Sequence, residues 1–339
     1  MPDPFQSLTP GTPLPLEAGD NFRAATHVWS KEEIRALRLA LAAQRPLLLR
    51  GEPGSGKSQL ARAAARVLGG GHPLVAVVHP RFEASDLLYS FDTLARLLDA
   101  QLGDKGDWDA SNERYLQPGV LWRAFEQGRQ GRRHPVVLID EIDKADADVP
   151  NSLLDVLANR SFEVPMRELA LRRVVADEDF APLIVFTTNE ERELPAAFVR
   201  RCVVLNLNPP QDEAALLDWM LERAQAHADV QGRVSAAVVQ RAVQQTLWDR
   251  KQVLAEGYPP VGLAEAIDLV RALERLTAEF TGTEAEREAE QHRLLDELSA
   301  YALVKYPLKD PGQKRDPLPR APAGPAADDA APADPASAP

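Results

Sequence analysis

The sequence contains a single cysteine, Cys202, so no intramolecular disulfide can form and we expect a protein of the reducing cytoplasm. It has no run of about 18 consecutive apolar residues, the length that a membrane span needs. Residues 1–20 have neither the positive flank nor the apolar core of a signal peptide. These absences argue against a secreted, disulfide-stabilised or membrane-spanning protein.

Positive charge is also scarce. Lys and Arg total 39 against 51 Asp and Glu, a net charge of −12, which disfavours a protein that binds nucleic acid mainly through phosphate contacts. The six histidines show no metal-ligand spacing, so we expect no protein-bound zinc. With 339 residues, of which 45% are apolar, the chain is long enough for one large or two ordinary globular domains.

Short apolar runs alternate with helix-like segments in the first two thirds of the chain. The strand-like runs are 46–50, 74–78, 136–139, 183–187 and 202–207. The helix-like segments are 57–68, 86–100, 118–128, 150–159 and 195–201, and a further helix follows the capping box of Ser30 and Glu33. This alternation predicts an α/β fold, a parallel sheet with helices on both faces.

The strand pattern stops after Pro209 and Pro210, and only helical patterns follow. We therefore predict four parts: a loosely ordered Pro-rich arm (1–28), an α/β domain (29–208), an all-helical domain (209–306) and a disordered Pro/Ala-rich tail (307–339).

Residues 51–58, GEPGSGKS, match the phosphate-binding pattern G-x-x-x-x-G-K-[ST] between a strand-like run and a helix. Gly51, Gly54 and Gly56 let backbone N–H groups point at phosphate oxygens, and the helix adds its positive dipole end. Lys57 is expected to reach the β- and γ-phosphates and Ser58 to bind Mg²⁺. The candidate nucleotide-binding residues are Gly51, Glu52, Pro53, Gly54, Ser55, Gly56, Lys57, Ser58 and Gln59.

A second apolar run, 136–139, ends in Asp140 and Glu141, where open α/β sheets bind ligands. We expect Asp140 to hold Mg²⁺ through water and Glu141 to act as general base on the attacking water. The alternative is a solvated acidic turn.

Two further candidates follow. Asn189, after the run 183–187, can orient the attacking water or contact the γ-phosphate, or else cap the next turn. Arg200 and Arg201 end a short helix, and one of them can project into a neighbouring subunit's phosphate site as an arginine finger; the alternative is a solvated helix end.

These motifs, in this order and followed by a helical domain, resemble the AAA+ ATPases over about residues 30–305. Within them the chain is similar to the MoxR branch, judging from 81–92, 115–125 and 143–165, with 99–117 as the branch's helix insert. The resemblance implies a P-loop NTPase sheet followed by a helical lid, with ATP and Mg²⁺ bound. It also implies a hexameric ring, remodelling of a protein client, and a von Willebrand A-domain partner.

The chain departs from the AAA+ pattern in the lid. Many relatives carry an arginine at the start of the third lid helix, but here that turn, 262–265, has no cation. Arg250, Lys251 and Arg271 remain as substitutes. A nucleotide-gated switch or scaffold with slow hydrolysis is therefore the alternative function, with a DNA-associated motor third. The motifs do not distinguish ATP from GTP.

Weaker features have two interpretations each. Trp108 and Tyr115 can grip a client or pack locally, and Phe162 and Val164 can form a surface loop, although packing is favoured. Residues 27–29 can lie against an adenine or act as a hydrophobic staple on the first helix.

Overall fold

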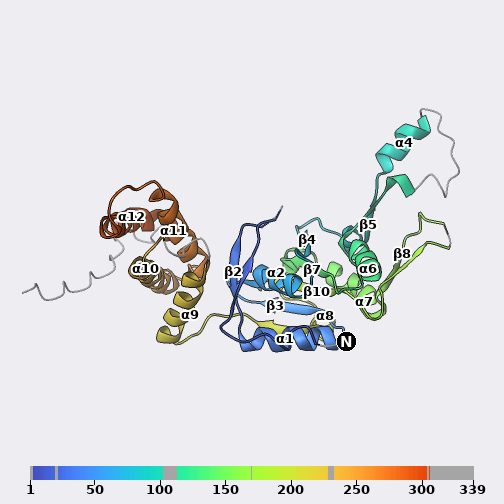
Figure 1. The fold of residues 1–339 in the computed structure, drawn as a ribbon. Helices are drawn as coiled ribbons and strands as arrows, with labels where there is room; N and C mark the ends of the chain where they lie inside the picture. The colour runs from blue at the N-terminus through green and yellow to red at the C-terminus, as the bar shows by residue number, and fades with distance from the viewer. Residues whose placement is uncertain are drawn as a thin grey trace, which may run out of the picture.

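The predicted parallel sheet is confirmed. The computed structural model describes residues 3–19, 22–101, 113–168, 170–227, 233–303 and 305. Within these ranges five strands form one sheet in the order β11-β3-β10-β7-β4, and each neighbouring pair is parallel (Figure 1). The strands are β3 (Leu47–Arg50), β4 (Leu74–Val77), β7 (Val136–Asp140), β10 (Leu183–Thr188) and β11 (Val203–Asn206).

Both faces of this sheet are covered, which explains why its strands are apolar at consecutive positions. Leu48, Ile139 and Phe186 point into one core, and Leu49 and Leu138 point into the other. The first core lies under α3 (Ala84–Leu88), α6 (Val120–Gly131), α7 (Asp148–Asn159) and α8 (Ala196–Val199). The second lies under α1 (Lys31–Ala42), with the predicted capping box of Ser30 and Glu33, and α2 (Lys57–Val67).

The N-terminal segment differs from the loosely ordered arm that we expected. β1 (Pro13–Leu16) pairs antiparallel with β2 (Ala25–Val28), and Phe5 and Trp29 are buried in the same core as α1 and α2. Four-residue strands are too short to show a period, and proline is tolerated in a two-stranded ribbon because each strand has a free edge. The folded part of the chain therefore begins well before residue 30.

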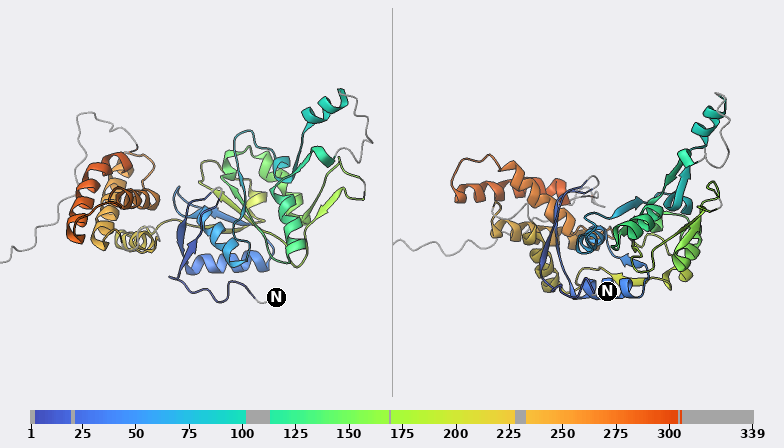
Figure 2. Two further views of the ribbon diagram at one scale, coloured as in Figure 1. Left: turned by 45° about the horizontal axis from the view of Figure 1, so that its top comes forward. Right: turned by 45° about the vertical axis from the view of Figure 1, so that its right-hand side comes forward.

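A second expectation also needs correction. The segment 86–100 is not one helix: it contains the end of α3, then β5 (Tyr89–Phe91) and α4 (Thr93–Gln101). β5 pairs with β6 (Leu116–Pro118), which follows the 3-10 helix η1 (Glu113–Tyr115), and together with α4 they project from the body (Figures 1 and 2). A single residue, Asp92, separates the strand from the helix.

The weaker candidates now have positions. Tyr115 is buried and donates a hydrogen bond to Asp99 Oδ2 at 2.6 Å, which fits local packing. Phe162 and Val164 are buried too, as favoured: Phe162 contacts the rings of Trp122 and Phe125. Phe162 lies in the hairpin of β8 (Ser161–Glu163) and β9 (Arg173–Val175). Trp108, most of the insert 99–117 and the tail 307–339 lie outside the described residues.

A separate helical unit lies beside β2 (Figure 1). It consists of α9 (Glu213–Ala226), α10 (Ala236–Ala255), α11 (Leu263–Leu276) and α12 (Glu284–Leu303), packed around a core of their own. None of the helices in the described ranges combines the length and hydropathy that a bilayer crossing requires.

Candidate functional site

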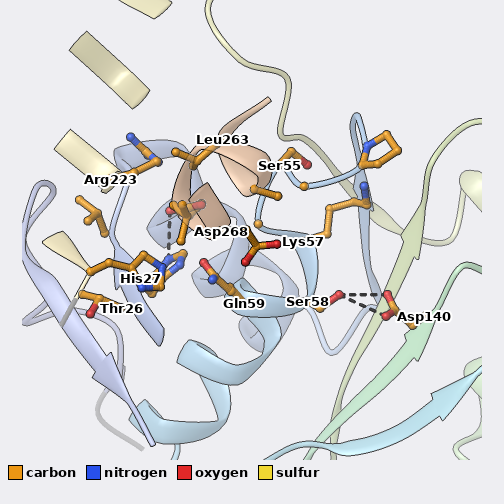
Figure 3. A pocket seen from close by; sticks show the side chains of 18 of the residues that line it. Thr26, His27, Ser55, Lys57, Ser58, Gln59, Asp140, Arg223, Leu263 and Asp268 are labelled. Atoms are coloured by element: carbon orange, nitrogen blue, oxygen red, sulfur yellow. Dashed lines mark hydrogen bonds and ion pairs between the residues drawn. The ribbon is translucent and has the colours of Figure 1, made fainter. Parts of the chain in front are cut away.

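A cavity of about 360 Å³ lies where the α/β body meets the helical unit (Figure 3). Its lining comes from the loop between β3 and α2, the carboxyl ends of β7 and β10, strand β2, and the helices α9 and α11. β10 lies between β3 and β7 in the sheet, so the predicted motifs at the ends of these three strands are adjacent.

The loop between β3 and α2 needs glycine at two positions for reasons of space. Gly51 has φ +155°, and a Cβ there would lie 2.8 Å from the carbonyl oxygen of Leu207. Gly54 has φ +77°, and a Cβ there would lie 2.8 Å from the Cβ of Ala264 in α11. The loop is therefore curled tightly between the sheet and the helical unit, with the first turn of α2 at its end.

Lys57 is buried at the centre of this loop. Its Nζ donates hydrogen bonds to the carbonyl oxygens of Gly51 at 2.8 Å and Glu52 at 2.9 Å. Burial lowers the pKa of the Lys57 ammonium, and the nearby carboxylates, Asp140 first among them, oppose that change. The loop thus holds a poorly solvated cation that a phosphate group would satisfy.

Ser58 and Asp140 meet as the sequence predicts. The Ser58 hydroxyl lies 3.2 Å from both carboxylate oxygens of Asp140, and Thr187 donates a 2.5 Å hydrogen bond to Oδ1 of the same group. A hydroxyl and a carboxylate are hard oxygen donors, and Mg²⁺ commonly binds to one or two protein ligands together with water and phosphate. Among the residues that the structure describes, no group of three or more acidic, His or Cys side chains is arranged to hold a metal ion.

Glu141 follows Asp140 with its backbone in the left-handed region, at φ +61°. Asn189 donates a hydrogen bond to its Oε1 at 3.2 Å, and Lys144 donates one to its Oε2 at 2.6 Å. The bond to Glu141 raises the pKa of Lys144. The structure therefore brings Glu141 and Asn189 together, and adds Lys144, which the sequence analysis did not select.

The two candidate finger residues lie elsewhere. Neither Arg200 nor Arg201 is among the described residues that line the cavity. Arg200 borders a separate hollow of about 480 Å³ together with Arg50 and Glu190, and Arg201 donates a hydrogen bond to the carbonyl of Ala197. Both side chains are exposed, so a second molecule could contact them.

Two cations of the helical unit do line the cavity. Arg271, one of the three substitutes considered, donates a hydrogen bond to the carbonyl of Ala24 at 2.7 Å. Arg223, which the sequence analysis missed, lies near His27 and on the side away from Lys57 and Asp140 (Figure 3). Burial lowers the pKa of Arg223. The phosphate end of the cavity therefore receives neither of these two cations in this arrangement.

The other two possible substitutes for the lid arginine, Lys251 and Arg250, do not line the cavity within the described residues. Lys251 is exposed and forms an ion pair with Glu213 inside the helical unit. Arg250 contacts Glu52 in the loop between β3 and α2 rather than the cavity itself.

Strand β2 forms the wall opposite the phosphate loop. Thr26, His27 and Val28 line the cavity, and His27 Nε2 lies 3.4 Å from Oε2 of Glu33. Trp29 is buried and meets the His27 ring edge-on. A base bound here would lie against β2, so the adenine interpretation of residues 27–29 stays a prediction.

Known proteins similar to this chain match mainly its α/β body. Residues 46–202 match the family model described as AAA domain (dynein-related subfamily). Protein MoxR of Methylorubrum extorquens is 28% identical over 190 residues, which are 56% of this chain and 48% of that protein. Midasin of Giardia intestinalis is 32% identical over 193 residues, which are 54% of this chain and 3% of that protein. The chain thus spans at most about half the length of these relatives.

The solved structures that match this chain include NtrX from Brucella abortus in complex with ADP, at 16% identity and a TM-score of 0.44 over 81% of this chain and 63% of that one. The RuvB Holliday junction branch migration motor of Thermotoga maritima has 16% identity and a TM-score of 0.41 over 79% and 70% of the two chains. By its sequence the chain resembles the AAA+ ATPases and, within them, the MoxR branch.

Proposed function

We propose that this chain, as an AAA+ ATPase similar to the MoxR branch, binds and hydrolyses ATP with the help of Mg²⁺. The observation that carries the proposal is the meeting of three strand ends at one cavity: Lys57 and Ser58 from the first, Asp140 and Glu141 from the second, and Asn189 from the third. In this proposal residues 29–208 form the ATPase domain and residues 209–306 its lid.

Each residue has a distinct role in the proposed reaction. The loop amides and Lys57 bind the β- and γ-phosphates, and Ser58 and Asp140 hold Mg²⁺, which neutralises charge on the phosphate oxygens. Glu141 accepts a proton from the attacking water while Asn189 orients that water. The new bond forms between the water oxygen and the γ-phosphorus, and the bond to the oxygen that bridges the β- and γ-phosphates breaks, which leaves ADP and phosphate.

The finer parts of the proposal concern assembly. We expect a cytoplasmic ring, a hexamer by resemblance, in which Arg200 or Arg201 of one subunit acts on the ATP of the next. Both arginines are exposed and outside the cavity of their own chain, and only a neighbour would bring them to a phosphate. A protein client, with a von Willebrand A-domain partner, fits the acidic net charge of −12 better than a nucleic acid does.

The substitution Glu141→Gln tests the proposal directly. Because the amide keeps the shape of the side chain but accepts no proton, ATP binding should persist while turnover falls at least about 100-fold. Binding is measured by equilibrium titration and turnover by phosphate release. Turnover equal to that of the unchanged chain would contradict the role of Glu141, and failure of the unchanged chain to bind ATP would contradict the function itself.

One observation favours a second candidate, a nucleotide-gated switch. Lys144 holds the Glu141 carboxylate at 2.6 Å, and the first turn of α11, from Leu263, carries no cation. A base held away from water would make hydrolysis slow and leave ATP to set the conformation for a partner. A turnover that no added protein raises would favour the switch.

A further inference from the structure

Arg250 joins the helical unit to the phosphate loop. From α10, its Nη2 donates to both carboxylate oxygens of Glu52, at 2.9 and 2.8 Å, across 198 positions of sequence. The Arg250 side chain is 11% exposed and that of Glu52 is 36% exposed. A charge-assisted contact of this kind, partly shielded from water, is stronger and more directional than an ordinary surface ion pair.

The same guanidinium is fixed from its other side. Nη1 of Arg250 donates a hydrogen bond at 3.0 Å to the carbonyl oxygen of Val261, which lies two residues before α11. Gly262 and Leu263 follow, and Ala264 lies directly over Gly54 of the phosphate loop. Arg250 therefore holds the start of α11 and Glu52 in one arrangement, with the loop between them.

Glu52 carries this contact further, to Lys57. The carboxylate of Glu52 accepts from Arg250, while its backbone carbonyl accepts from Lys57 Nζ at 2.9 Å. Glu52 is thus held through its side chain by a cation of the helical unit and through its backbone carbonyl by the phosphate-binding lysine. A shift of Glu52 would move one of the two oxygens that position the Lys57 ammonium.

We propose that Arg250 is a positioning residue for phosphate binding, which acts through Glu52 on the loop and on Lys57. This inference rests on the proposed function, since it assumes that the loop binds the phosphates of ATP. It explains how the helical unit influences phosphate binding although the first turn of α11 has no cation. Arg250 contacts Glu52, the second residue of the phosphate loop. It therefore acts on the shape of the loop, and the helical unit needs no cation at the γ-phosphate.

A double-mutant cycle on ATP affinity tests the proposal in the full chain. Arg250→Ala and Glu52→Ala should each weaken Mg·ATP binding on the order of tenfold, measured by equilibrium titration. The double variant should bind no worse than the weaker single variant, because both remove the same contact. Additive losses would overturn the proposal.

Two further variants exclude a purely structural role. Exchange of the charges, Arg250→Glu with Glu52→Arg, should recover affinity relative to Arg250→Glu alone, which the loss of the Val261 contact by itself would not allow. Arg250→Lys keeps the charge without the planar fork and should give an intermediate loss. These two variants also serve if Arg250→Ala fails to fold, as circular dichroism would show.

The matched control is Arg241→Ala. Arg241 belongs to the same helix, but its partner, Asp296 at 3.4 Å, lies within the helical unit. Its removal should leave ATP affinity within about twofold. Equal affinity of the unchanged chain and Arg250→Ala would contradict this inference alone, whereas absence of ATP binding by the unchanged chain would contradict the proposed function.

Discussion

Glu141 is held by two donors at once, and this has a chemical consequence at the scale of single residues. Asn189 occupies one carboxylate oxygen and Lys144 the other. Each carboxylate oxygen has two lone pairs, so each can accept one further hydrogen bond from water. The Lys144 ammonium nevertheless limits the directions from which water can approach Glu141, so we expect Glu141 to act more readily as the proposed base when Lys144 moves away.

Replacing Lys144 by alanine should raise the basal turnover of the unpartnered chain by up to about tenfold. The reason is that this partly exposed ion pair stabilises the held position by at most about 1.4 kcal/mol, which corresponds to a factor of ten. Phosphate release under saturating ATP measures the effect, with Lys144→Arg as the control that keeps a donor in place. A fall in turnover would mean instead that Lys144 assists the reaction.

Sequence motifs locate some of these residues and miss others for a physical reason. Lys57, Ser58 and Asp140 have roles tied to fixed spacing within one strand–loop–helix segment, so a pattern finds them. Thr187 donates a hydrogen bond to Asp140, 47 positions away, and the charge of Glu33, 190 positions from Arg223, acts on the pKa of Arg223; no local pattern marks either residue. Lys144 lies within the stretch 143–165 that the sequence analysis used. Its ion pair with Glu141, three residues earlier, could have been predicted from the short helical turn that joins the two residues.

At the scale of elements, the phosphate loop and α11 are packed without spare space. A Cβ at Gly54 would meet the Cβ of Ala264 at 2.8 Å, and the backbone there is left-handed. The start of α11 is therefore a rigid wall of the loop, although none of its side chains has a donor for phosphate.

The substitution Gly54→Ala should weaken ATP binding more than backbone strain alone explains. Gly71→Ala is the matched control, because Gly71 has nearly the same φ, +74°, and open space around it. Each change should cost about 1–2 kcal/mol of unfolding free energy from the left-handed backbone. Only Gly54→Ala should also lower ATP affinity; equal affinities in the two variants would show that the contact with Ala264 does not matter.

Short elements were the hardest part of the fold to predict. The sheet strands were found because runs of consecutive apolar residues have one explanation, burial on both faces. The strands β1, β2 and β5 have only three or four residues each, which is too few for a hydrophobic period to be recognised in the sequence. The apolar residues of the ribbon of β1 and β2, such as Leu16 and Ala25, are recognised only from the core that they cover.

At the scale of the whole molecule, the proposed finger predicts that active sites are shared between subunits. Chains with Glu141→Gln keep both arginines, and chains with Arg200→Ala and Arg201→Ala keep the base. Each variant alone should turn over slowly, and a mixture of the two should recover part of the activity as mixed rings form. Phosphate release across mixing ratios measures this, and no recovery in rings confirmed by mass measurement would exclude a finger at these positions.

The helical unit touches the α/β body near both ends of the cavity. At the phosphate end, Arg250 holds Glu52 close to Pro209, through which the two parts are also covalently joined. At the far end, Arg271 holds the carbonyl of Ala24, just before β2. The first point is reinforced by the peptide chain, whereas the second is held by noncovalent contacts alone. We therefore expect the cavity to open by rotation of the helical unit about an axis near Pro209, after the hydrogen bond between Arg271 and the carbonyl of Ala24 breaks.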